Sequence, residues 1–309
     1  MCGVFGFSQL DKQTGCMAAF LAFSMEGRGH DSWGGSNGDE IIKRLGPISA
    51  SWFLPRDWKR GIFHTRLATV GAKTERNSHP FEVFNTDHSR RLVGLHNGGV
   101  SNYHSLNTKY SRNCEVDSEH IFHHLADNLP MHELSGRGTL VWIDSNEASV
   151  INLARWSYGD LEVAELEDHG ICFASQREPI ERAARMARIK IKNFYQPLVD
   201  GYRHTIDGVN LYKHEDLKFT SPNSANNYNS GWYEHGRHNR NYSSNWQTDT
   251  GAAKCKRCHQ IETKKVICAV CMRSLREEFE HKLKHVADQK TVLHGPVRPK
   301  ITVVNGGVN

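Results

Sequence analysis

The sequence predicts an α+β fold followed by a small metal-binding module. Strand-like and helix-like stretches alternate up to about residue 215. A segment rich in Asn, Ser, Gly and Tyr, residues 218–253, then interrupts this pattern. Two C-x-x-C pairs come after that segment, and their spacing is typical of a structural zinc module. We therefore expect a large domain over residues 2–215, a linker and a small metal-stabilised unit.

Short apolar runs predict the strands of the first domain. The runs 61–71 and 91–100 close on glycines, as buried strands do where they end at a site. Four further runs have the same character and are expected to be strands: 4–10, 138–144, 149–155 and 171–175.

Two stretches predict helices, and one predicts a hairpin. Residues 117–129 carry an N-cap residue, Asp117 or Ser118, followed by apolar residues at helical spacing. Residues 179–188 begin with a proline, which is well suited to the first turn of a helix. Residues 197–212 contain two Asp-Gly pairs and predict a closing hairpin.

The segment 218–253 predicts a flexible linker. It has almost no aliphatic side chain, so it cannot bury enough apolar surface to offset the entropy lost on ordering. The charge also changes at its end. From Lys254 onward, 12 Lys and Arg face 5 Asp and Glu, a net charge of +7, although the whole chain carries only +5. The basic character therefore belongs to the C-terminal part.

The N-terminus offers a candidate nucleophile. Cys2 follows a methionine that cells usually remove when the next residue is small. A thiol is mostly protonated at neutral pH, and it needs a base to attack a substrate. An N-terminal amine titrates near pH 8, so a mature chain beginning at Cys2 would hold thiol and base in one residue. A simple packing role for Cys2 is the alternative.

Six stretches in order carry a family resemblance. They are MCGVFGF (1–7), RGHDSWG (28–34), HTRLATVG (64–71), NSHP (77–80), HNGGVSNY (96–103) and VDSEHIF (116–122). Together they resemble the class II glutamine amidotransferase domain of the N-terminal nucleophile (Ntn) hydrolases. The resemblance implies a four-layer αββα sandwich over residues 2–215 and the hydrolysis of L-glutamine to glutamate and ammonia.

The resemblance also implies roles for individual residues. Cys2 would attack the glutamine side-chain amide, and Asn97 with Gly98 would form the oxyanion hole. Arg66 would hold the substrate carboxylate, for which a planar guanidinium is suited, and Asp117 would bind the substrate ammonium. The remaining implied residues are Thr65, Ala68 and Thr69 in the glutamine pocket, with Arg28, Gly29 and His79 as supports of the site.

The C-terminal part predicts a structural zinc site. Cys255, Cys258, Cys268 and Cys271 supply the four thiolates that tetrahedral zinc requires. Such a set leaves no open position for catalysis, and an iron–sulfur cluster is the alternative. The module is expected over 254–290, followed by a tail over 291–309. A helix carrying His120, His123 and His124 also has metal-binding spacing, but the sequence supplies no paired third ligand.

The sequence thus predicts a cytoplasmic glutaminase that passes ammonia to an acceptor on a separate protein. No run of about 20 apolar residues predicts a membrane span, and the N-terminus does not look like a secretory signal. Two other functions stay open. The domain could be an idle scaffold whose basic zinc module binds nucleic acid or protein, or a hydrolase of another amide.

Overall fold

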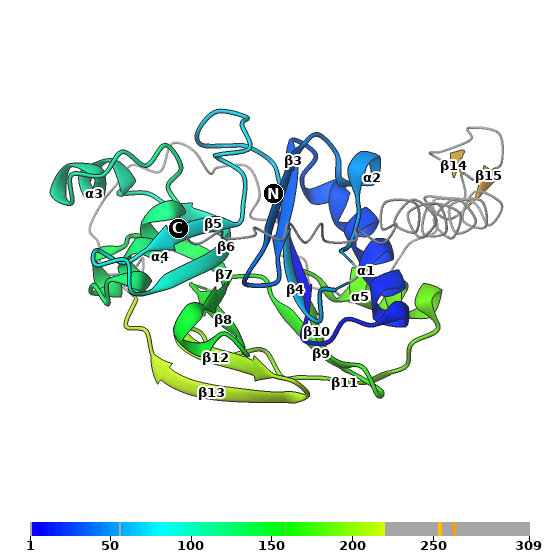
Figure 1. Ribbon diagram of the computed structural model, residues 1–309. Helices are drawn as coiled ribbons and strands as arrows, with labels where there is room; N and C mark the ends of the chain where they lie inside the picture. Colours follow the sequence, from blue (N-terminus) through cyan, green and yellow to red (C-terminus); the bar gives the residue numbers. More distant parts are fainter. Residues whose placement is uncertain (1, 56, 158, 220–252, 255–261, 264–309) are drawn as a thin grey trace, which may run out of the picture. The chain divides into compact units, whose positions relative to one another are not determined.

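The computed structural model describes residues 2–55, 57–157, 159–219, 253–254 and 262–263 (Figure 1). Met1, most of the expected linker, the four tail cysteines and the expected tail 291–309 lie outside these residues. The chain divides into two units, Met1–Asn229 and Ser230–Asn309. In the second unit the described residues form one short antiparallel pair, β14 (Ala253–Lys254) with β15 (Glu262–Thr263).

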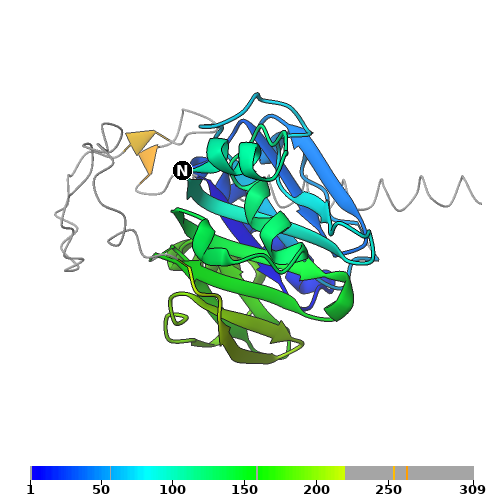
Figure 2. The same ribbon diagram turned by 90° about the vertical axis from the view of Figure 1, so that its left-hand side faces the viewer.

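Two antiparallel sheets form the centre of the first unit. The larger sheet contains, in spatial order, β11 (Ile191–Phe194), β9 (Glu162–Leu166), β10 (Gly170–Ala174), β1 (Gly3–Phe7), β4 (Gly61–Arg66), β2 (Ser32–Ser36) and β3 (Ile41–Leu45). The smaller sheet contains β13 (Asn210–Asp216), β12 (Tyr202–Asp207), β8 (Ile151–Trp156), β7 (Gly136–Asp144), β6 (Arg91–Val100) and β5 (Phe81–Phe84). Figures 1 and 2 show the two sheets facing each other.

Helices cover the outer face of each sheet. On the larger sheet, α1 (Lys12–Met25) packs beside α5 (Arg177–Ala187), and α4 (Glu119–Ala126) packs on β5 and β6 of the smaller sheet. Short helical segments fill the connections: η1 (Glu26–Arg28), α2 (Ile48–Ser51), α3 (Tyr103–Lys109), η2 (Met131–Glu133) and η3 (Ser145–Glu147). None of the helices in the described residues combines the length and apolar character needed to cross a membrane.

Three separate hydrophobic cores define the layers. Strand β1 shows how one strand serves two of them, because side chains alternate across a strand. Phe5 and Phe7 pack into the core under α1 and α5, whereas Val4 packs into the core between the sheets. A third core joins the smaller sheet to α4 through residues such as Trp142 and Phe122. The expected order of helix, sheet, sheet and helix is therefore found in the first unit.

Most of the expected strands are confirmed, but two of them are too long, and the run 4–10 is a strand only as far as Phe7. The run 61–71 is a strand only as far as Arg66, and the residues after it form a loop. The hairpin of β12 and β13 turns at Gly208, where φ is +58°. At the domain boundary, Phe219 stacks on Trp156 with the ring centroids 4.6 Å apart, so packed structure continues to that residue.

Helix α1 is not evident from the sequence pattern. Most of its length, GCMAAFLAFSM, is small or apolar, because the helix packs both on the larger sheet and against α5 and has no wide polar face. Its start is nevertheless marked locally. The Asp11 carboxylate accepts hydrogen bonds from the Gln13 and Thr14 amides, and the Thr14 hydroxyl accepts one from the Asp11 amide. This capping box satisfies donors that the first helical turn leaves free.

Candidate active site

The predicted site residues lie where β1, β4 and β6 end. Cys2 directly precedes β1, and Gly3 pairs in register with Thr65 near the end of β4. Strand β6 belongs to the other sheet, but it reaches this end of the molecule. The His64 ring approaches the His96 carbonyl at 3.2 Å, which joins β4 to β6 across the two sheets. Residues from distant parts of the sequence are thus brought to one place.

The Cys2 thiol is held against the chain that follows Arg66. Its Sγ lies 3.4 Å from the Leu67 amide nitrogen and 3.6 Å from the Leu67 carbonyl oxygen. Burial raises the pKa of the thiol, although the Leu67 amide and the positive charges of Arg66 and Arg28 act in the opposite direction. The resting group is therefore a protonated thiol, which requires a base before it can attack.

Arg28 and Gly29 support the backbone around Cys2. The Arg28 Nε donates a hydrogen bond of 2.8 Å to the Cys2 carbonyl, and Arg28 also lies 3.6 Å from the Asp160 carboxylate. A side chain at Gly29 would collide with the backbone of Thr65 and Arg66. Glycine at this position allows the segment before β2 to lie directly against the end of β4.

Arg66 organises the loop that follows it. Its guanidinium is buried, and it donates hydrogen bonds to the Val70 carbonyl at 2.6 Å and to the Ala72 carbonyl at 3.1 Å. Burial lowers the pKa of Arg66, while Cys2, Asp31 and Asp117 act on it in the opposite direction. The predicted carboxylate-binding residue is therefore at the site, with its donors engaged by its own loop.

Asp31 fixes the same loop from outside. Its carboxylate accepts hydrogen bonds from the Ala68 amide at 2.8 Å and from Lys73 Nζ at 2.7 Å. These bonds lower the pKa of Asp31, with the Lys73 hydrogen bond contributing most. In the loop itself, Ala68 is half-buried, while Thr69 is exposed. The predicted pocket residue Thr65 is buried, and its hydroxyl donates to the Met25 carbonyl at 3.1 Å.

Asn97 is connected to β1 through Ser175. The Asn97 side-chain amide donates to the Ser175 hydroxyl at 3.3 Å, and the same hydroxyl accepts the Val4 amide at 3.0 Å. The next residue, Gly98, pairs with Gly138, and a side chain at this position would collide with the Arg137 carbonyl. Both predicted oxyanion-hole residues therefore lie on β6 at the level of the first residues of β1.

Asp117 terminates β6 instead of capping helix α4. Its Oδ2 accepts the Val100 amide at 2.6 Å, and the carboxylate is 7% exposed. The N-cap position of the helix is Ser118, which makes no side-chain capping bond. Of the two residues expected at the N-cap, Ser118 therefore takes the position, and the Asp117 carboxylate is committed to the end of β6.

His79 lies in a cluster of buried histidines behind the site. Its ring is 4.1 Å from the His64 ring, and neither of its nitrogens has a hydrogen-bond partner among the described residues. Burial lowers the pKa of His64 to about 3 and the pKa of His79 well below its ordinary value. Both rings are neutral at physiological pH, so their contribution to this site is packing.

Three residues at the site were missed as functional candidates in the sequence. Leu67 contributes only backbone atoms, which its side-chain type cannot reveal. Asp31 lies within RGHDSWG, a stretch that carries the family resemblance, and Ser175 ends the run 171–175 that was expected to be a strand. Their partners lie in distant segments, Asp31 against Ala68 and Ser175 against Asn97, so only the folded chain reveals their roles.

Comparisons with known proteins show similarity to class II glutamine amidotransferases. Residues 57–144 match the model of the family described as "Glutamine amidotransferases class-II". A glutamine–fructose-6-phosphate aminotransferase (isomerizing) of Streptococcus agalactiae is 32% identical over 179 residues, which cover 50% of this chain and 29% of the relative. A Listeria innocua enzyme of the same name is 25% identical over 258 residues, 76% of this chain and 41% of the relative. The matches thus span less than half the length of these relatives.

Solved structures show the same fold at low sequence identity. A glutamine phosphoribosylpyrophosphate amidotransferase from B. subtilis matches with a TM-score of 0.52 and 18% identity, covering 70% of this chain and 49% of the other. A structure described as the allosteric regulatory enzyme of purine biosynthesis matches with a TM-score of 0.53 and 17% identity, with the same coverage. Together with the family match, these structures support a domain of the class II glutamine amidotransferase type.

Proposed function

We propose that this domain hydrolyses L-glutamine to glutamate and ammonia, with the Cys2 thiol as the nucleophile. The observation that carries the proposal is the position of Cys2. Its sulfur lies against Leu67, directly after the buried Arg66, and Arg66 interacts electrostatically with both Cys2 and Asp117. Since burial raises the pKa of the thiol, the reaction needs a nearby base. The free amine of Cys2, after removal of residue 1, supplies it.

The proposed reaction has two steps. The amine accepts the thiol proton as sulfur bonds to the amide carbon of glutamine. The carbon–nitrogen bond then breaks, and ammonia leaves with the proton that the amine returns. Water next attacks the thioester, which releases glutamate and restores the thiol. In each step negative charge develops on the carbonyl oxygen, where the Asn97 amide and the Gly98 N–H would stabilise it.

Opposite charges at the site fit the two charged groups of glutamine. Arg66 would bind the α-carboxylate by exchanging the carbonyls of Val70 and Ala72 for the carboxylate oxygens. Asp117 would bind the α-ammonium with the oxygen that Val100 leaves available. Thr65, Ala68 and Thr69 would complete the pocket, with Arg28, Gly29 and His79 supporting it. These pairings select glutamine from amides that lack the amino-acid end.

Ammonia release from glutamine tests the proposal. The full chain should release ammonia and glutamate in equal amounts, and Cys2→Ala should abolish the activity. Cys16→Ser is the matched control, because Cys16 is a half-buried cysteine of helix α1. Equal rates for wild type and Cys2→Ala would disprove the proposed nucleophile. An unchanged KM in Arg66→Ala would instead indicate that the domain acts on another amide.

We also propose that the ammonia passes to an acceptor protein, with the C-terminal module as the docking unit. Cys255, Cys258, Cys268 and Cys271 would bind one structural zinc ion, and the +7 charge from Lys254 onward suits an acidic partner. Affinity capture with the full chain should recover a synthetase or transferase. Recovery of nucleic acid instead would favour a binding role for the module.

A further inference from the structure

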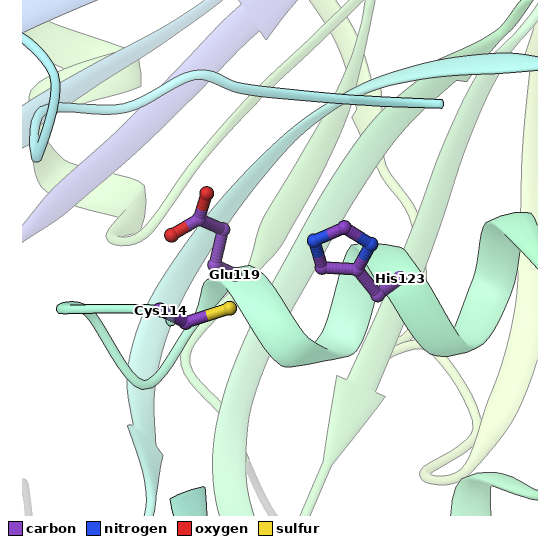
Figure 3. A group of neighbouring side chains, drawn as sticks. All are labelled: Cys114, Glu119 and His123. Carbon is purple, nitrogen blue, oxygen red and sulfur yellow. The ribbon is translucent and has the colours of Figure 1, made fainter. Parts of the chain in front are cut away.

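A second group of reactive side chains surrounds the start of helix α4. Donor atoms of Cys114, Glu119 and His123 all lie within 4.8 Å of one another. Figure 3 shows Glu119 and His123 on the same side of the helix, with the Cys114 sulfur beside Glu119. Cys114 is buried, and the other two side chains are half-buried.

We propose that Cys114, Glu119 and His123 form a zinc-binding site. Thiolate, imidazole and carboxylate are all common zinc ligands, and the i, i+4 spacing places two of them on one helix face. Donors on a tetrahedral zinc ion lie about 3.5 Å apart, so the three side chains need to close by about 1 Å. Three protein ligands leave a fourth position for water or a small ligand.

The neighbouring histidines are not available for this site. His120 Nε2 lies 3.0 Å from Asn107 Oδ1, and His124 Nδ1 lies 2.8 Å from the His120 carbonyl. The helical histidine pair visible in the sequence is therefore engaged elsewhere. The structure instead brings two other ligands to His123. Glu119 lies one helical turn before it, and Cys114 lies in the loop before the helix.

Cys114 and Glu119 can supply two negative charges for a divalent cation, although the positive charges of Lys43, Arg76 and Arg112 also act on the three residues. Zinc binds imidazole in its neutral form and a thiol as the thiolate. Binding at Cys114 therefore displaces one proton to the solvent. The resulting thiolate and the Glu119 carboxylate offset the two positive charges of the ion. In the absence of an ion, the positive charges of Arg76 and Lys43 stabilise the charged form of Glu119.

The ion can reach the site from solvent. His123 lines an open pocket of about 390 Å³ together with Tyr110, Arg112 and Asp127. The Arg112 guanidinium lies over the Tyr110 ring at 4.4 Å and is 3.7 Å from the Asp127 carboxylate. Arg112 is thus held by two partners, which leaves the His123 side of the pocket open to an incoming ion.

A bound ion would fix the segment that presents Asp117. The ligands Cys114 and Glu119 flank Asp117 in the sequence. Between them, Glu115 accepts a hydrogen bond of 2.7 Å from Asn77, which also donates to the Ala72 carbonyl of the Arg66 loop. The proposed zinc binding does not depend on the proposed glutaminase activity. Only an effect of zinc on the KM for glutamine would rest on the proposed function.

Zinc titration of a suitable full-length variant tests the site. In this variant Cys255, Cys258, Cys268 and Cys271 are all serine, so the tail contributes no thiolate. Competition with a chromophoric chelator should show one equivalent of zinc bound with submicromolar Kd. Cys114→Ser and His123→Gln should each weaken binding at least 100-fold, and Glu119→Gln at least 10-fold. Cys16→Ser and His104→Gln, the latter on the exposed side of α3, should bind like the parent.

Cobalt absorption and thermal unfolding guard against misfolded variants. Co²⁺ added to the parent should give a sulfur-to-metal band that Cys114→Ser lacks, and saturating zinc should raise the parent Tm. If the parent binds no zinc or cobalt, the proposed site does not exist. Unchanged affinity in folded Cys114→Ser and His123→Gln would also overturn the proposal, whatever the glutaminase activity proves to be.

Discussion

At the scale of single residues, the site depends on short contacts between side chains and distant backbone. Cys2 lies against Leu67, Asn97 bonds Ser175, and Asp117 bonds Val100. All three side chains are held by atoms from another strand or segment. Their geometry therefore reflects the packing of the two sheets, and a change in a partner should affect catalysis without touching substrate.

Ser175→Ala should lower kcat for glutamine hydrolysis by about 10- to 100-fold with little change in KM. Ser175 is a positioning residue, since its hydroxyl joins the Asn97 amide to the Val4 amide. Loss of a direct oxyanion donor costs about 10²–10³ in rate, and a misplaced donor should cost less. Steady-state kinetics check this. A change of this size in KM, with kcat unchanged, would contradict the positioning role.

The pH dependence of glutamine hydrolysis should follow the titration of the α-amine and not that of the Cys2 thiol. Because burial raises the pKa of Cys2, little thiolate exists at neutral pH. We expect kcat/KM to rise with pH through the titration of the α-amine, about 7.7–8.0, and then level off. A rate that continues to rise above pH 9 would indicate that preformed thiolate is the reactive species.

At the scale of elements, the loop after β4 is held by Asp31 and Arg66. Asp31→Asn should raise glutamine KM several-fold and leave kcat nearly unchanged, because the Ala68 and Lys73 bonds weaken. Lys73→Ala is the matched control. Its ammonium is exposed, and an exposed ion pair contributes only about 0.2–1 kcal/mol. A larger effect in Lys73→Ala than in Asp31→Asn would contradict this role.

The lowered pKa of Asp31 also predicts how the stabilising contribution of this residue changes in acid. The folded pKa of Asp31 is lowered by its hydrogen bonds, so its stabilising contribution is complete above the unfolded value of about 3.9. That contribution disappears as the pH falls through the lowered folded value. The difference in Tm between wild type and Asp31→Asn should therefore shrink below pH 4 and vanish in stronger acid.

The capping box of α1 offers a test of local stability. Asp11→Ala should lower the free energy of unfolding by about 1 kcal/mol, since it removes the bonds to the Gln13 and Thr14 amides. Asp11→Asn keeps an acceptor oxygen and should stay close to wild type. Urea unfolding measures both variants. Equal losses in the two would show that charge, for example the contact to His169, matters more than the cap.

The elements also show what the sequence could predict. Short apolar runs and the Asp-Gly turns identified most strands of the smaller sheet and the central strands β1, β4 and β10, because buried strands of this kind are apolar and end at glycines. Helix α1 was missed because it lacks a polar stripe, and the strand at 61–71 was extended too far because LATVG is apolar although it forms a loop. The candidate residues followed from the family resemblance, whereas the contacts that hold them came only from the folded chain.

At the scale of the whole molecule, three cores stabilise four layers. The inner core between the sheets also sets the distance between β1 and β6, on which the site depends. Leu95→Ala in that core should cost about 2–5 kcal/mol, because Leu95 is fully buried. Leu45→Ala is the control, since Leu45 is 51% exposed and its loss should cost under about 0.5 kcal/mol. Comparable losses in both variants would contradict this assignment of the core.

The most direct test of the proposed function is the intact mass of the full chain after reaction with a diazoketone analogue of glutamine. The proposed function predicts a chain that lacks the mass of Met1 and gains one equivalent of the analogue on Cys2. Glutamine should protect against labelling, and Cys2→Ala should remain unlabelled. A chain that retains Met1, or labelling that persists in Cys2→Ala, would contradict the proposal that Cys2 with its own amine is the nucleophile.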